Sequence, residues 1–177
     1  MTPLTFATLR EVARMASKHF PHCAIGGGAP RDVYLGGDVK DIDLFVDTRE
    51  MPEGAYESAV PAFLAEIAPG GYIEQTNDPS VEADASYDLH SGDLPPIQIL
   101  PVSRCVFNDV HDYDFGLSQI LVTKDGYVFT TAFLSDVEGF NITYMKPGYN
   151  ARSAERLRRI HAKYPQHTPV NCGTLLL

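Results

Sequence analysis

The chain has 177 residues, of which 44% are hydrophobic and 21% charged, and its formal net charge is −9 at pH 7. This length is enough to bury a single core, and we expect residues 1–177 to form one domain. No apolar run is long enough to span a membrane, and the first residues do not resemble a signal peptide. The acidic charge argues against stable non-specific binding to DNA, which requires a basic surface.

In the first half of the chain, spacing predicts helices at residues 5–18 and 56–67, and strands at residues 23–25 and 72–75. The strand at 23–25 runs into three glycines, Gly26, Gly27 and Gly28. A short helix follows, with a proline in its first turn and a Gly-Gly pair at its end. The next strand begins at Asp41-Ile42-Asp43 and ends at Val46.

In the second half, residues 77–96 are rich in Asp, Ser, Gly and Pro and predict a surface loop or a loose hairpin. Strands are expected at 97–102 and 142–145, and a hairpin of 115–122 with 127–133 around an Asp-Gly turn. Residues 151–164 predict a helix with a basic face that is either merely solvated or a local RNA-binding patch. That face comprises Arg152, Arg156, Arg158, Arg159 and Lys163.

The three cysteines, Cys23, Cys105 and Cys172, are odd in number and widely spaced. They form no C-x-x-C pair with histidines at the spacing of a zinc site. We therefore expect reduced thiols in a cytoplasmic protein.

Asp41 and Asp43 are the sharpest candidates for chemistry. Side chains at positions i and i+2 of a strand point to the same face, so the two carboxylates form a seat for a hard cation such as Mg²⁺. The glycines just upstream allow a phosphate to approach the backbone closely. A phosphate cradle beside a two-carboxylate seat favours phosphoryl or nucleotidyl transfer over the alternative of acidic residues that merely face solvent.

The same segment resembles a known family. Gly27-Gly28-Ala29-Pro30-Arg31-Asp32, then Leu35-Gly36, then Lys40-Asp41-Ile42-Asp43-Leu44 is similar to the G-G-x-x-R-D … D-x-D signature of the nucleotidyltransferase superfamily. The nearest branch is the head domain of tRNA nucleotidyltransferases (CCA-adding enzymes) and bacterial poly(A) polymerases, together with small single-domain phage and bacterial relatives. The resemblance implies an α/β (α+β) fold of the polymerase-β-like palm type. Such a fold has a small mixed β-sheet of about five to seven strands, helices mainly on one face, and a cleft at the carboxyl end of the Asp-x-Asp strand.

The resemblance also implies roles for individual residues. Asp41 and Asp43 would bind Mg²⁺ or Mn²⁺, and Gly27 and Gly28 would hold the triphosphate of a nucleotide such as ATP. Arg31 and Asp32 would lie beside the nucleotide, although Arg31 paired with Asp32 is an equal alternative, and Lys40 adjoins the metal seat. These assignments make residues 27–43 the predicted nucleotide site.

The third carboxylate of the family is where this sequence departs from the pattern. The expected strand here reads Ile97-Gln98-Ile99, and Gln98 offers a carbonyl oxygen but no charge. Downstream, Asp114 lies between two aromatic residues and is the candidate third metal ligand and catalytic residue. The alternatives are a structural role for Asp114, and a site with two aspartates or without catalysis.

The implied activity is metal-dependent transfer of a nucleoside monophosphate from a nucleoside triphosphate, with release of pyrophosphate. The acceptor is unidentified: an RNA or tRNA end, a small molecule or a protein. Full CCA-adding enzymes need further helical domains, so we expect a stand-alone transferase or one completed by a partner subunit. A toxin–antitoxin component that modifies tRNA or a partner kinase is a further enzymatic possibility. The alternative, kept open by Gln98, is a non-catalytic nucleotide-binding, regulatory or inhibitory protein on the same scaffold.

Overall fold

The computed structural model describes residues 4–76 and 85–175. Its first elements are α1 (Phe6–Ala16), β1 (Cys23–Gly26), α2 (Gly28–Tyr34), β2 (Ile42–Asp47), α3 (Ala55–Ile67), β3 (Tyr72–Thr76), β4 (Ser86–His90) and β5 (Ile97–Val102). They are followed by α4 (Val106–Asp109), the 3₁₀ turns η1 (Val110–Asp112) and η2 (Gly116–Ser118), β6 (Ile120–Thr123), β7 (Gly126–Phe129), α5 (Thr131–Gly139), β8 (Asn141–Thr143), α6 (Ala151–Lys163) and β9 (Thr168–Val170).

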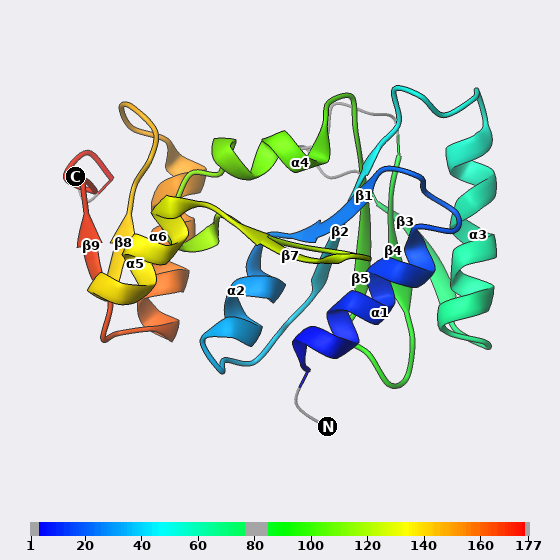
Figure 1. The fold of residues 1–177 in the computed structure, drawn as a ribbon, viewed down its shortest axis with the longest axis horizontal. Coiled ribbons are helices and arrows are strands. Elements are labelled where there is room, and N and C mark those ends of the chain that lie inside the picture. Colours follow the sequence, from blue (N-terminus) through cyan, green and yellow to red (C-terminus); the bar gives the residue numbers. More distant parts are fainter. Residues whose placement is uncertain (1–3, 77–84, 176–177) are drawn as a thin grey trace.

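A seven-stranded mixed sheet in the order β3-β4-β5-β2-β1-β6-β7 forms the centre of the molecule (Figure 1). Among the described residues, its neighbouring strands are antiparallel except for β2 and β5, which run parallel. A parallel pair needs a crossover connection, and the segment from α3 to β4 supplies it. The predicted mixed sheet is confirmed.

The larger core lies between the sheet and helices α1, α2 and α3. Alternate residues of the strands face it, including Ile42 and Leu44 of β2 and Ile97 and Ile99 of β5. A smaller cluster under α4 and η1 covers part of the opposite face. The long helices that pack on the sheet therefore lie on one face, as predicted, and the other face is left open over part of its area.

A second core gathers beyond the β6 side of the sheet, where α6 packs with β8 and β9 (Figure 1). Helix α6 begins after Asn150, whose side chain accepts a hydrogen bond from the backbone N–H of Ser153, the usual means of satisfying a free helix end. Its buried side chains include Ala154, Leu157 and Ile160. This core places the end of α6 next to α2.

Two segments differ from the prediction. Residues 86–90 of the predicted 77–96 loop form strand β4, while residues 77–84 lie outside the described part. Residues 131–133, predicted as the end of a strand, instead begin helix α5, which the hydroxyl of Thr130 caps by accepting from the backbone N–H of Phe133. The hairpin itself is confirmed, but it is shorter than predicted and consists of β6 and β7.

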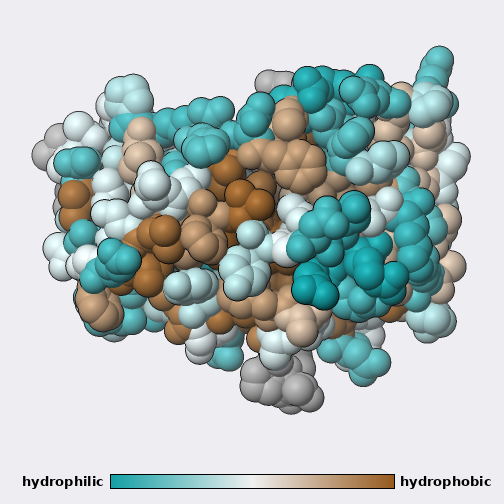
Figure 2. All heavy atoms as spheres, in the orientation of Figure 1, coloured by the Kyte–Doolittle hydropathy of each residue, from teal (hydrophilic) through white to brown (hydrophobic). Residues whose placement is uncertain are grey.

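The surface separates into polar and apolar regions. Figure 2 shows hydrophilic side chains over α1 and hydrophobic ones beside it, in the region of β7 and α5. The exposed hydrophobic residues of β7 are Tyr127, Val128 and Phe129. Within residues 4–76 and 85–175, no helix combines the length and the apolar character needed to cross a bilayer.

Candidate functional site

Strand register places a row of residues across the open face of the sheet. Asp43 of β2 pairs with Gly26 of β1 on one side and with Gln98 of β5 on the other. Gln98 in turn pairs with Asp88 of β4, and Asp88 with Glu74 of β3. Their neighbours along each strand face the larger core, so these side chains point to the face opposite α1 and α3.

Asp41 and Asp43 lie at the amino end of β2, because the strand begins at Ile42. The predicted location of the cleft at the carboxyl end of this strand is therefore wrong. The side chain of Asp41 is 47% exposed, and the nearest cation to it is the ammonium of Lys40, 3.8 Å from its Oδ2 atom. Lys40 is itself exposed to solvent, so both side chains are accessible to a ligand.

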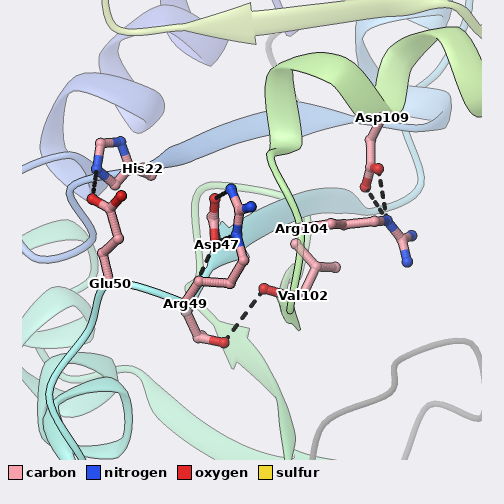
Figure 3. Close-up of polar contacts among 8 residues, drawn as sticks. His22, Asp47, Arg49, Glu50, Val102, Arg104 and Asp109 are labelled. Carbon is pink, nitrogen blue, oxygen red and sulfur yellow. Dashed lines mark hydrogen bonds and ion pairs between the residues drawn. The ribbon is translucent and has the colours of Figure 1, made fainter.

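The carboxyl ends of β2 and β5 hold a different set of polar groups, which pair with one another (Figure 3). The pairs are His22–Glu50, Asp47–Arg49 and Arg104–Asp109. Arg49 donates to both oxygens of Asp47 at 2.9 and 2.6 Å, and these hydrogen bonds lower the pKa of that carboxyl. This end of the strands is occupied by internal hydrogen bonds and ion pairs and is not the candidate site.

Gly27 brings the glycine turn against Asp43. Its φ of 68° and ψ of −133° are accessible mainly to glycine. A Cβ atom at this position would lie well inside 3.0 Å of the Asp43 Oδ2 atom, which real contacts do not allow. Gly28 then begins α2, so the predicted phosphate cradle and the predicted metal seat are adjacent in space.

Arg31 and Asp32 belong to a buried network of hydrogen bonds and ion pairs. They are 8% and 5% exposed, and the Arg31 Nε atom donates to Asp32 Oδ1 at 2.8 Å. Asp32 also accepts from Lys163 Nζ at 2.6 Å and from the Tyr164 hydroxyl at 2.8 Å, while Arg31 donates to Ser118 Oγ at 3.2 Å. Of the two alternatives for Arg31, the structure contains the ion pair with Asp32.

Asp114 is directed toward α6. It accepts from Arg156 Nη1 at 2.7 Å and from Ser153 Oγ at 2.9 Å. The described residues contain no group of three or more His, Cys, Asp or Glu side chains placed to hold a metal ion. The structure therefore does not support Asp114 as a third ligand, because its charge is matched by an arginine of the predicted basic face.

Several side chains of the basic face of α6 form intramolecular ion pairs. Besides Arg156, Arg158 pairs with Glu155 at 2.5 Å and Lys163 with Asp32. The patch expected to grip RNA is thus partly a set of intramolecular ion pairs.

Asp88 and His90 are site residues that the sequence did not reveal. With Lys40, Asp41, Pro96 and Gln98 they line a cavity of about 200 Å³ beside Asp41. The Gln98 Nε2 atom donates to Asp88 Oδ1 at 3.2 Å. The signal for Asp88 was the alternation of Ser86, Tyr87, Asp88, Leu89 and His90, which is that of a half-buried strand.

Tyr113 closes the row at its other end. Its hydroxyl lies where a side chain on Gly26 would have to go, and its ring is 6.2 Å from that of Phe45. Burial raises the pKa of the hydroxyl, and the negative charges of Asp109 and Asp43 raise it further. Tyr113 therefore stays protonated and neutral beside the carboxylates.

No protein-family model matches the chain, and no curated protein sequence does. Solved structures do match. A CCA-adding enzyme solved with CTP has a TM-score of 0.65 and 14% identity over 96% of this chain and 41% of the enzyme. The Thermotoga maritima CCA-adding enzyme in complex with tRNA has a TM-score of 0.66 and 14% identity, over 96% of this chain and 40% of the enzyme.

A tRNA nucleotidyltransferase solved with a primer tRNA and an incoming ATP analogue gives a TM-score of 0.60 and 16% identity over 84% of this chain and 43% of the enzyme. The chain thus spans about two fifths of the length of these structures. At such low identity the likeness establishes the fold, which is the one that the glycine and Asp-x-Asp signature predicted.

Proposed function

From a fold shared with CCA-adding enzymes, we propose that this chain transfers a nucleoside monophosphate from a nucleoside triphosphate to an acceptor and releases pyrophosphate. One observation carries the proposal: Asp43 stands on the open face of the sheet, directly against the glycine turn at Gly27, and Asp41 lines the cavity that Gln98 and Asp88 also line. The enzymes of similar fold were solved with CTP or an ATP analogue, which supports a triphosphate as the substrate.

The donor set at this site fits Mg²⁺ or Mn²⁺. Both are hard cations that prefer oxygen ligands, and Mg²⁺ is commonly held by one or two carboxylates together with substrate phosphates. Asp41 and Asp43 supply two carboxylates, and the described part of the chain holds no group of three His, Cys, Asp or Glu side chains placed for a metal ion. The ion would accordingly be held tightly only when the triphosphate is bound, and its chemistry would be to stabilise negative charge on the phosphates.

The remaining residues have distinct tasks in this proposal. The backbone N–H groups at Gly27 and Gly28 would donate to the triphosphate. The lack of a side chain at Gly27 leaves room for the Asp43 carboxylate. Lys40 is free to approach a phosphate oxygen from solvent. Arg31 and Asp32 act indirectly, by fixing α2 to α6. This arrangement orients the triphosphate and leaves the acceptor side open.

We propose an RNA end as the acceptor. Two of the enzymes of similar fold were solved with tRNA, and the chain spans only about two fifths of their length. A net charge of −9 disfavours a broad nucleic-acid surface, so the RNA would be held by local contacts or by a partner subunit. If the acceptor is instead a protein or a small molecule, the label will appear on that molecule and not on RNA.

The test is transfer of label from each α-³²P nucleoside triphosphate to RNA, to protein and to small molecules, with and without Mg²⁺. Asp41→Asn and Asp43→Asn should each lower turnover by about 100-fold or more, the order expected when a group that stabilises transition-state charge is lost. Asp125→Asn, in an exposed turn, is the matched control and should have no effect. Thermal unfolding of both site variants checks that any loss of turnover does not come from a loss of folding.

The non-catalytic alternative rests on Gln98, which stands beside Asp43 where the resembling enzymes carry a carboxylate. It predicts binding of a triphosphate without transfer, unchanged by Asp41→Asn. That result would exclude the transferase and leave a nucleotide-binding or regulatory protein.

A further inference from the structure

Gln98 and Asp88 are joined by a hydrogen bond whose direction is fixed by chemistry. An ionised carboxylate can only accept, so the amide of Gln98 must present its Nε2 atom to Asp88 Oδ1, at 3.2 Å. The Oε1 atom of the same planar amide then points away from Asp88.

The strand order determines what lies on that other side. Strand β5 has β4 as one neighbour and β2 as the other, and Gln98 is in register with Asp88 on β4 and with Asp43 on β2. With the amide nitrogen held on the β4 side, the carbonyl oxygen is left available to a ligand between Gln98 and its other register neighbour, Asp43. All three side chains share the open face of the sheet, and the cavity beside Asp41 is lined by both Gln98 and Asp88.

We propose that Asp88 is a positioning residue, which holds the amide of Gln98 so that its carbonyl oxygen faces Asp43 and joins the two aspartates in binding a divalent cation. This inference rests on the proposed function, since it concerns the same cation. Gln98 thereby contributes a neutral oxygen, and the negative charge of Asp88 polarises that oxygen through the amide. The two residues work as a pair distributed over neighbouring strands.

The pairing also accounts for the absence of a carboxylate at position 98. A glutamate there would stand directly opposite Asp88 in an antiparallel pair, where like charges are destabilising. The double variant Gln98→Glu with Asp88→Asn puts the carboxylate on β5 and the amide on β4. An amide donor then again faces a carboxylate acceptor, and the net charge is that of the wild type. This double variant should bind the cation at least as tightly as the wild type.

The experiment measures Mn²⁺ binding by electron paramagnetic resonance with a non-hydrolysable triphosphate present, for Asp88→Asn, Gln98→Leu and the combination of the two. Each single variant should weaken Mn²⁺ binding by about 3- to 10-fold, roughly the value of one hydrogen-bonded ligand. In the Gln98→Leu background, Asp88→Asn should have no further effect, because Asp88 acts through Gln98. Asp125→Asn, which removes a charge from an exposed turn outside the site, is the matched control and should leave binding unchanged.

Equal weakening by Asp88→Asn in both backgrounds would overturn the inference, because the charge of Asp88 would then act directly. Wild-type Mn²⁺ affinity in Gln98→Leu would overturn it as well. A readout on the wild type does not depend on any variant: the side-chain amide NMR resonances of Gln98 should shift on titration with Mg²⁺ and triphosphate, and constant resonances would refute the proposal.

Failure of this inference is distinguishable from failure of the proposed function. If Asp41→Asn abolishes Mn²⁺ binding while Gln98→Leu does not alter it, only the role of Gln98 and Asp88 is refuted. If Asp41→Asn has no effect, or if the wild type binds no Mn²⁺ with triphosphate present, the metal site itself is refuted.

Discussion

Substitution of Gly27 by alanine tests whether the glycine turn controls the metal seat. Two costs arise from the structure. A non-glycine residue at φ 68° and ψ −133° is strained by about 1–3 kcal/mol. In addition, the new methyl group overlaps Asp43 Oδ2, so that either the carboxylate or the turn must move. At about 2–4 °C per kcal/mol for a chain of this size, we expect the unfolding temperature to fall by roughly 2–12 °C.

Gly36→Ala separates these two costs. Gly36 has a φ of 71°, close to that of Gly27, but a Cβ atom added to it meets nothing within 4 Å. It therefore carries backbone strain of about 1–2 kcal/mol without any displacement near the site. Both variants should lose stability, and only Gly27→Ala should lose Mn²⁺ binding in the presence of triphosphate.

The assay is thermal unfolding by circular dichroism, followed by Mn²⁺ titration below the unfolding temperature of both variants. We expect Mn²⁺ affinity in Gly27→Ala to fall by at least about 10-fold, since one of the two proposed carboxylate ligands would be displaced. Wild-type affinity in Gly27→Ala, or an equal loss in Gly36→Ala, would refute the reasoning that links the turn to Asp43.

Three further predictions concern buried groups. Asp32→Ala leaves a buried arginine and its other donors without their carboxylate and should cost about 3 kcal/mol in chemical denaturation; a loss below about 1 kcal/mol would contradict the network. Among the residues that the structure describes, the buried His167 ring nitrogens have no hydrogen-bond partner, and burial lowers the pKa of the ring, so the folded state holds fewer protons than the unfolded one. Stability should be full above the unfolded value of 6.5 and decline as the pH falls below it, and His167→Leu should abolish that decline in pH-dependent denaturation. Burial raises the pKa of the Cys23 thiol to about 12, so at pH 8 a thiol reagent should modify the more exposed Cys105 first, and Cys105→Ser should remove the fast phase.

Much of the fold could be predicted because local patterns and tertiary packing agree. Helix α1 carries its buried residues at helical spacing, and Gly36, with positive φ, ends α2 where the Gly-Gly pair predicted. The two aspartates and the glycine turn are close in sequence, and the single antiparallel pairing of β1 with β2 brings Gly26 opposite Asp43. A site built from two paired strands that are consecutive in the sequence, with only the short helix α2 between them, is within reach of sequence reasoning.

The rest depended on pairings between distant strands. Asp88 lies in a segment whose polar composition indicated a loop. This segment forms strand β4 because Tyr87 and Leu89 pack on the larger core and because β3 and β5 pair with it on either side. Asp114 was predicted as a third metal ligand because it lies between two aromatic residues. Only the tertiary structure shows that Arg156 pairs with its carboxylate. Register between β4, β5 and β2 leaves no trace in the sequence, so the contact of Asp88 with Gln98 was not predictable.

The hydrogen bond from Lys163 to Asp32 has a consequence for the order in which the protein matures on the ribosome. The two residues are 131 positions apart. At synthesis rates of about 5–20 residues per second, the carboxylate emerges roughly 7 to 26 s before its ammonium partner. During that interval the turn proposed to receive nucleotide has been synthesised but lacks its anchor, so we expect the nascent chain to bind ligands only after Lys163 has emerged.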